Sequence, residues 1–253
     1  MDDLGRLSAG LGDSVAGAES ALEAADRLCR ACVELLQVDG ASISLIRGGA
    51  SQGTFGSSSE LSRRLDEYQF TYGEGPCLDA VRTGRPVLVS DLQDTHEHRW
   101  PAFTAATVND GIVAVFALPV RVASIPVGAL DLFRHQPGAL SNDRLNGSRV
   151  AARLASVPLL ALMRLDFHPE QDQPIGEPWD QLASLERVEV YQATGMIMGA
   201  MDIGAPEALV RLRAYAYTQG MTASEVAWLI VERRLLPDVD DWWRGLHDQA
   251  DGA

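Results

Sequence analysis

The distribution of apolar positions separates an N-terminal part of mixed periodicity from a C-terminal part that is helical throughout. Between Glu19 and Val38, apolar residues recur every three or four positions, which predicts an amphipathic helix. Alternating or continuous apolar runs predict strands at residues 41–46, 51–57, 86–90, 112–122 and 127–134. Further helices are expected over residues 58–70, 77–83, 103–108 and 141–165. This order predicts an α+β fold in which one antiparallel sheet packs against helices.

The C-terminal part predicts three short helices between residues 186 and 236. The first covers residues 188–201, and Gly204 is expected to provide the turn that ends it. The second begins at Pro206, because a residue without an N–H is tolerated in a first helical turn. It ends at Gly220. The third begins with Thr222-Ala-Ser-Glu225, the pattern of a capping box in which two side chains bind backbone N–H groups reciprocally.

These three helices resemble the ANTAR domain of bacterial antitermination regulators. The matching positions occur in order along the chain: Gln192–Met198, Glu207–Ala208, Leu212–Arg213, Ala216, Glu225–Ala227 and Ile230–Val231. ANTAR domains are three-helix modules that bind paired RNA hairpins and prevent a transcription terminator from forming. The resemblance therefore implies RNA binding. Many members of the family carry a lysine where this chain has Thr194, so a phosphate or base contact expected there is either replaced or absent.

Five residues of this region are our candidates for RNA contact. Hairpin loops present splayed bases beside a phosphate track, and arginine can bind both. Gln192 and Thr194 lie in the motif that carries the resemblance. The complete set of candidates is Arg187, Gln192, Thr194, Arg211 and Arg213. The alternative is a protein-binding regulatory module without RNA activity.

The N-terminal part resembles a GAF domain over about residues 19–165. The residues that carry the resemblance are Gly73–Leu78, Val87–Leu92, Trp100–Phe103, Gly111, Leu118–Val120 and Gly128–Leu130 through Gly138. GAF domains sense small molecules, haem, light or redox state, or they dimerise. The resemblance thus implies a small-molecule ligand or a dimerisation role. The cyclic-nucleotide subgroup carries a lysine in its signature, which this lysine-free chain does not match.

Cys77 is the candidate redox residue. It lies in the first turn of a predicted short helix, where backbone N–H groups can stabilise a thiolate. A less favoured alternative is a GAF-fold reductase of free methionine sulfoxide, which resembles the chain around Cys77. Those enzymes need a further cysteine after the next loop, and residues 99–104 contain none, so we predict no catalytic residue. Cys29 and Cys32, on a core-facing helix, are interpreted as buried structural thiols.

Two histidines raise the question of a metal site. His96 and His98 alternate on a predicted loop and are able to ligate a metal or haem, but no third ligand is evident in the sequence. We therefore interpret this segment as a solvated loop and predict no metal and no cofactor.

The charge balance restricts the partners. Acidic residues number 35 against 21 basic residues, for a net charge of −14, and every basic residue is an arginine. The absence of lysine excludes Schiff-base chemistry and a P-loop lysine. Because an acidic chain binds nucleic acid poorly through long-range attraction, RNA binding must depend on local geometry. Abundant alanine and arginine without lysine are typical of a high-GC bacterial source, which favours the actinobacterial type of GAF and ANTAR regulator.

The chain is expected to be cytoplasmic, without a membrane partner. Its longest apolar runs, Ile112–Val120 and Val157–Met163, are far shorter than a membrane span. The acidic N-terminus is followed by no apolar signal segment. An odd count of three cysteines favours reduced thiols.

The expected organisation has five segments. Residues 1–18 form a flexible N-terminus, 19–165 the GAF-like domain, 166–180 a proline-rich acidic linker, 181–237 the ANTAR-like domain and 238–253 an acidic tail. Trp242 and Trp243 in the tail are expected to dock on the protein's own helices.

The functional prediction is a one-component regulator whose GAF-like domain senses a signal or dimerises and whose ANTAR-like domain binds RNA hairpins to control transcription termination. A homodimer is expected, because a lone three-helix module buries little surface. Its contacts are predicted to come from the apolar seam Trp179–Val188 and from a stripe on the closing helix of the GAF-like domain, formed by Val150, Leu154, Val157 and Ala161.

Overall fold

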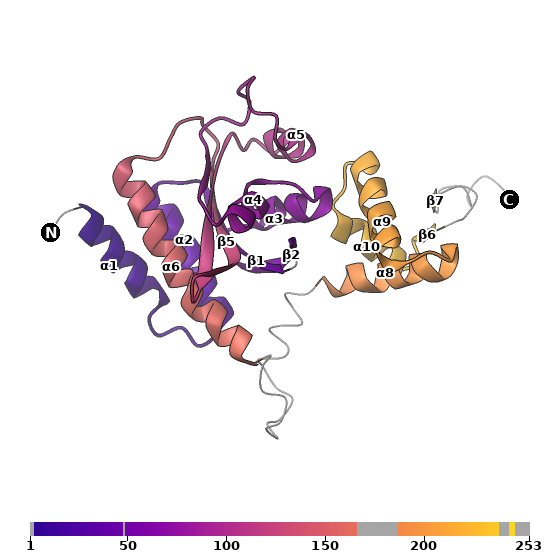
Figure 1. Cartoon of the computed structure of the whole chain (residues 1–253), viewed down its shortest axis with the longest axis horizontal. Helices are drawn as coiled ribbons and strands as arrows, with labels where there is room; N and C mark the ends of the chain where they lie inside the picture. Colours follow the sequence, from indigo (N-terminus) through magenta and orange to yellow (C-terminus); the bar gives the residue numbers. More distant parts are fainter. Residues whose placement is uncertain (1–2, 48, 166–186, 238–242, 246–253) are drawn as a thin grey trace. The chain divides into compact units, whose positions relative to one another are not determined.

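The computed structural model describes residues 3–47, 49–165, 187–237 and 243–245 (Figure 1). The chain divides into two compact units, Met1–Glu186 and Arg187–Ala253, and each is described by itself. The predicted linker, most of the Trp179–Val188 seam, and all of the acidic tail except residues 243–245 lie outside the described residues.

Five strands in the described part of the N-terminal unit form one antiparallel sheet, in the order β2-β1-β5-β4-β3. The strands are β1 (Gly40–Arg47), β2 (Ala50–Ser57), β3 (Val87–Val89), β4 (Ala114–Val122) and β5 (Ile125–Arg134). In the turn between β4 and β5, Ala123 and Ser124 have φ values of 46° and 72°. Positive φ at both positions matches the right-handed twist of a hairpin. The antiparallel sheet predicted from the sequence is confirmed.

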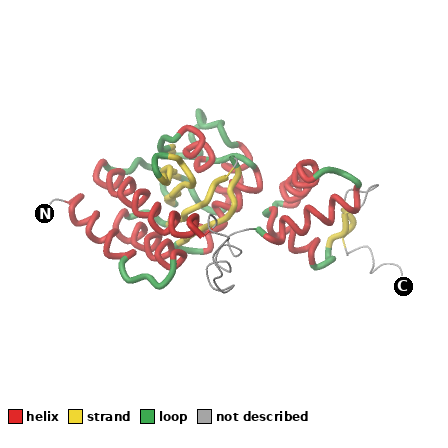
Figure 2. The backbone as a smooth tube through the Cα atoms, turned by 60° about the horizontal axis from the view of Figure 1, so that its bottom comes forward, coloured by secondary structure: helices red, strands yellow, loops and turns green. Residues whose placement is uncertain are grey.

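Helices cover both faces of this sheet (Figures 1 and 2). On one face lie α2 (Ala21–Leu36) and α6 (Asn142–Leu165), and on the other lie α3 (Glu60–Tyr72), α4 (Pro76–Thr83) and α5 (Pro101–Asn109). Side chains along β5 alternate between the two faces of the sheet, so this strand contributes to the hydrophobic core on each side. Leu130 and Leu132 pack with α2 and α6, whereas Ala129 and Phe133 face the opposite layer. Asp131 falls on that second face, and this position gives it a role in the candidate site.

The N-terminus is helical, so the expectation of a flexible segment over residues 1–18 is wrong for most of it. Helix α1 (Asp3–Val15) packs against α2 and α6, and it buries Leu7 and Leu11. Leu4, Leu7, Leu11 and Val15 have helical spacing. The glycines, alanine and serines between them hid this pattern, because such residues are typical of loops.

Within the described residues, the C-terminal unit contains three helices, as predicted: α8 (Val188–Met201), α9 (Ala205–Gln219) and α10 (Ala223–Val231). Small and aliphatic side chains make up the interface between them. Buried examples are Ala193, Ile197, Ala208, Leu212, Ala216, Val226, Ala227 and Ile230. After α10, the strand β6 (Leu235–Pro237) pairs with β7 (Trp243–Gly245), a small ribbon that the sequence did not predict (Figure 2). Trp242 lies outside the described residues.

The helix ends agree with the sequence at two of three places. The capping box of Thr222 and Glu225 is present, and Gly220 ends α9 with a φ of 64°. The prediction for Gly204 was wrong. Asp202, at a φ of 52°, takes the left-handed conformation that ends α8, and Gly204 is instead the N-cap of α9. An aspartate tolerates this conformation better than most residues because its short polar side chain can hydrogen-bond locally.

Candidate functional site

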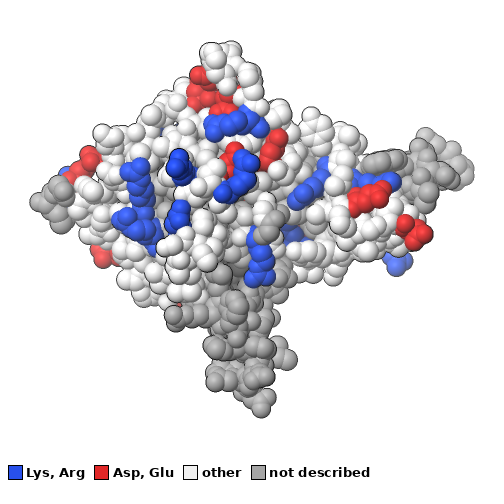
Figure 3. All heavy atoms as spheres, in the orientation of Figure 1, with Lys and Arg blue, Asp and Glu red and all other residues white. Residues whose placement is uncertain are grey.

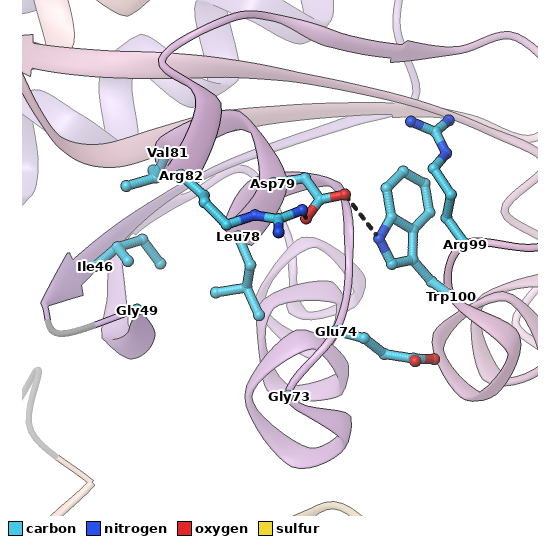
Figure 4. Close-up of a pocket in the computed structure, with 10 residues that line it drawn as sticks. All are labelled: Ile46, Gly49, Gly73, Glu74, Leu78, Asp79, Val81, Arg82, Arg99 and Trp100. Atoms are coloured by element: carbon cyan, nitrogen blue, oxygen red, sulfur yellow. Dashed lines mark hydrogen bonds and ion pairs between the residues drawn. The ribbon is translucent and has the colours of Figure 1, made fainter.

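A pocket of about 620 Å³ opens in the N-terminal unit beside α4 (Figure 4). Aliphatic and glycine residues line one side, and charged residues with one indole line the other. The lining residues are Ile46, Gly49, Gly73, Glu74, Leu78, Asp79, Val81, Arg82, Arg99 and Trp100. A pocket of this size can hold a small organic molecule.

Charged residues of the pocket are held by mutual contacts. Asp79 accepts hydrogen bonds from Arg82 at 2.8 Å and from the indole Nε1 of Trp100 at 3.3 Å (Figure 4). The guanidinium of Arg99 lies 4.2 Å from the centre of the Trp100 ring. Glu74 accepts from the backbone N–H groups of Ala102 and Phe103 at 2.8 and 3.0 Å, at the start of α5. The indole of Trp100 is nearly buried, and both arginines are paired with carboxylates, Arg82 with Asp79 and Arg99 with Glu97.

Behind α4, a buried polar cluster connects helices α3 and α4 to the sheet. The amide of Gln69 donates to Oδ2 of Asp131 at 2.9 Å and accepts the backbone N–H of Cys77 at 2.7 Å. The Cys77 thiol also hydrogen-bonds to Asp131. Next to them, Asp66 accepts from Ser51 at 2.9 Å and from Thr54 at 3.0 Å, between α3 and β2. None of these polar side chains was singled out from the sequence except Cys77.

Burial raises the pKa of Asp131 from an ordinary value of 3.8 to about 7. The negative charge of Asp66 also raises it, whereas the hydrogen bonds from Gln69 and Cys77 lower it. Asp131 is fully buried, and its Oδ1 atom has no hydrogen-bond partner among the described residues. The fold therefore holds a carboxyl group whose protonation changes near neutral pH.

All three cysteines are buried and carry thiols that form no disulfide. Burial raises the pKa of Cys32 to about 12, and burial followed by the nearby Cys32 raises that of Cys29. High thiol pKa values make both groups poor nucleophiles, in agreement with a structural role. Cys77 lies at the start of α4, as expected, but it is fully buried there. Its redox role stays a prediction.

The five RNA-binding candidates occupy different environments in the C-terminal unit. Gln192 is exposed on α8. Thr194 is buried on the inner face of the same helix, and its hydroxyl donates to the carbonyl of Val190 at 2.6 Å. Arg187, the residue before α8, is also buried, and its carbonyl accepts from the N–H of Val190. Of these three candidates, Gln192 has the most accessible side chain.

The two arginines of α9 point to different surroundings. Arg211 donates to Glu207 at 2.8 Å and approaches the sulfur of Met201 at 3.6 Å, at the C-terminal end of α8. Arg213 is half-buried, and burial, followed by the charge of Arg187, lowers its pKa. The structure therefore brings Arg213 near Arg187 and places Arg211 at the other end of α8. That helix has 14 residues and is about 20 Å long.

Three exposed aromatic residues, one on each helix, were missed in the sequence. Tyr191, Tyr217 and Trp228 are 59%, 60% and 54% exposed. Each lies outside the apolar face of its helix. An aromatic residue at such a position is the sequence signal that could have indicated an exposed binding residue. Exposed large aromatics are typical of binding surfaces because they supply contact area and can stack on bases.

Other classes of site find little support in the described part of the chain. It contains no group of three or more histidine, cysteine, aspartate or glutamate side chains suited to a metal ion. His96 lies in an exposed loop, with its Nδ1 atom 3.0 Å from Asp94. No helix in the residues searched is both long and apolar enough to cross a bilayer.

Comparison with known families agrees with this architecture. The GAF domain model matches residues 18–157, and the ANTAR domain model matches residues 181–231. The chain belongs to the GAF domain family and carries a C-terminal ANTAR domain, which confirms both resemblances. Both are regulatory domains and generally non-enzymatic. The protein is thus a regulator in which a sensory or dimerisation domain precedes an RNA-binding domain.

A solved GAF domain shows the fold of the N-terminal unit, and two further structures resemble it more weakly. The GAF domain of an Acinetobacter phosphoenolpyruvate-protein phosphotransferase has a TM-score of 0.51 at 13% identity, over 66% of this chain and 99% of that one. The corresponding domain from Coxiella burnetii has a TM-score of 0.49 at 15% identity, over 65% and 97%. Free methionine-R-sulfoxide reductase from Neisseria meningitidis has a TM-score of 0.48 at 13% identity, over 65% and 95%. A search of curated proteins finds no match.

Proposed function

We propose that this protein is a one-component regulator that binds paired RNA hairpins in a nascent transcript and thereby controls transcription termination. The observation that carries the proposal is the ANTAR domain match over residues 181–231, which coincides with the three described helices α8 to α10. The protein acts in the cytoplasm, where the transcript is made, and performs no catalysis.

Local geometry has to provide the affinity for RNA. Residues 180–237 carry five arginines against seven carboxylates, so the region has no long-range attraction for a polyanion. Arg213 and Arg187 are close enough for the charge of one to lower the pKa of the other. A phosphate beside this pair would offset their repulsion, and Arg211 and Gln192 would contact the RNA elsewhere on the unit. Tyr191, Tyr217 and Trp228 are positioned at the surface, where bases can stack on them.

Two copies of the chain are needed if each ANTAR domain binds one hairpin of a pair. In the predicted stripe on α6, Val150 and Leu154 pack inward against the core, whereas Val157 is 67% exposed. The side chain of Ala161 lies outside the described residues. We therefore assign α6 a smaller share of the dimer contact than the stripe implied. Light scattering should show a homodimer at micromolar concentration, and a monomer there would remove the support for a paired site.

The pocket beside α4 is the proposed sensory site. Its aliphatic wall and its paired charges suit a small ligand that has both an apolar and a polar part. Through Cys77 in its first turn, α4 is linked to Gln69 and Asp131. A ligand that moves α4 would thus disturb the buried cluster.

The decisive experiment is a titration of the full-length protein with an RNA of two hairpins and with a scrambled RNA of the same composition. We expect the two-hairpin RNA to bind more tightly at every salt concentration tested. Equal binding of both RNAs would exclude hairpin recognition and leave the protein-binding regulatory module as the better explanation for the exposed aromatic residues.

A further inference from the structure

A second pocket in the N-terminal unit, of about 260 Å³, lies where α6 crosses the end of β4. Three arginines from these two elements surround it: Arg121 on β4 and Arg149 and Arg153 on α6. The rest of the lining is small or apolar and consists of Gly84, Pro86, Leu118, Pro119, Ala152 and Ser156. No acidic residue lines this pocket.

The guanidinium of Arg121 is fixed in place without being neutralised. It donates from Nη1 to the carbonyl of Ser124 at 2.7 Å and from Nη2 to the carbonyl of Gly84. Arg149 donates to the neutral side-chain oxygen of Asn146 at 2.9 Å. Across the described residues, none of the three pocket arginines forms a salt bridge. Their charges therefore stay available to an anion.

No carboxylate among the lining residues offsets the positive charge of this pocket. Arg149 and Arg153 are four residues apart on one helix, a spacing at which like charges repel. The chain as a whole has a net charge of −14, and nonetheless arginine side chains gather over the region of α6 (Figure 3). An anion in the pocket would convert the repulsion into attraction to all three groups.

We propose that this pocket binds the phosphate group of a small organic phosphate. Arginine forks recognise phosphate through paired charge-assisted hydrogen bonds, and Arg121 is already oriented by its two carbonyl partners. The wall of Leu118, Pro119 and Ala152 gives the carbon part of the ligand an apolar surface. The volume is below the usual range for drug-sized ligands, which favours a small metabolite over a nucleic-acid strand. The site shares no lining residue with the pocket beside α4.

Calorimetric titration of the full-length protein at constant ionic strength tests the proposal. The probes are ribose 5-phosphate, inorganic phosphate and ribose. We expect ribose 5-phosphate to bind at least as tightly as inorganic phosphate and ribose not to bind. Arg149→Gln and Arg153→Gln should each weaken binding of ribose 5-phosphate by about tenfold or more, the value of one charge-assisted hydrogen bond.

Arg30→Gln is the matched control, because it removes the same charge from an exposed position on α2. It should leave the affinity unchanged, and circular dichroism should show that all three variants are folded. Equal affinity in Arg149→Gln, Arg153→Gln and the wild type would overturn the proposal, as would the absence of binding by both phosphate probes. RNA binding that depends on Arg149 and Arg153, with no binding of the small phosphates, would show instead that the face belongs to the RNA surface.

Discussion

Gln69 and Asp131 are joined by a hydrogen bond of 2.9 Å from the amide Nε2 to the carboxyl Oδ2. The same amide accepts the backbone N–H of Cys77, so one side chain of α3 holds both β5 and α4. Gly75 permits this arrangement. Its φ is 144°, and a Cβ atom there would lie 2.5 Å from Oε1 of Gln69. A side chain at position 75 would therefore displace the Gln69 amide from its two partners.

The first prediction concerns the stability of the N-terminal unit as pH changes. Burial raises the pKa of Asp131 to about 7, so the folded state favours the protonated carboxyl group. Below the ordinary pKa of an aspartate, Asp131 is protonated in both the folded and the unfolded state. As the pH rises from about 4 to about 7, the unfolded state ionises first, and the free energy of unfolding falls by up to roughly 4 kcal/mol. Asp131→Asn should flatten this part of the profile, measured by urea unfolding at a series of pH values. Asp143→Asn, at an exposed position on α6, should retain the slope of the wild type.

The second prediction concerns Cys77. Serine in its place can still donate to Asp131, and the buried site is closed to oxidants, so Cys77→Ser should change stability only modestly and leave RNA binding intact. Hairpin binding is to be measured with and without hydrogen peroxide in the wild type and in the variant. A loss of binding on oxidation that occurs only in the wild type would establish Cys77 as a redox sensor.

The third prediction concerns the start of α10. Thr222 accepts the N–H of Glu225 at 3.2 Å, and Glu225 accepts the N–H of Thr222 at 2.8 Å. Thr222→Ala removes half of this box and should lower the stability of the C-terminal unit by about 1 kcal/mol. Thr218→Ala is the control, since Thr218 is exposed and donates only to a carbonyl of its own helix. Stability is measured by circular dichroism during urea unfolding. Equal losses of stability in the two variants would show that the capping box contributes no specific stability.

Elements with a strong apolar period could be predicted from the sequence. Helix α2, the β4–β5 hairpin and the three C-terminal helices bury side chains at regular spacing, and such spacing is local information. Capping by Thr222 was predictable for the same reason. Helix α1 was missed because small residues dilute its apolar stripe, although Leu7 and Leu11 are buried.

The buried polar cluster could not be predicted, because its members are far apart in the sequence. Asp131 lies 62 positions from Gln69, and only the register of β5 in the sheet brings it beside α3 and α4. A polar residue within an apolar strand is also ambiguous, since it reads as an exposed position in the usual alternation. The same limit applies to Arg187 and Arg213, whose proximity depends on how α9 packs against α8.

The last prediction concerns the RNA contacts of α9. Arg211→Ala and Arg213→Ala should each weaken binding of the two-hairpin RNA by roughly 1–3 kcal/mol, the range for a good base-edge contact. Arg234→Ala is the control for Arg211, because both arginines pair with a nearby glutamate, Arg234 with Glu232 at 3.3 Å.

Loss of the Arg211–Glu207 pair itself explains little of such an effect, because exposed pairs at this spacing contribute only about 0.3–0.5 kcal/mol to stability. Arg213 is half-buried, so its variant must also be compared by urea unfolding, which separates lost packing from a lost contact with RNA. Since few phosphates are expected to be contacted, the affinity should fall only shallowly with salt. A steep dependence together with unchanged binding in Arg211→Ala and Arg213→Ala would place the RNA surface on other residues, because binding through many phosphates requires more cations than α9 presents.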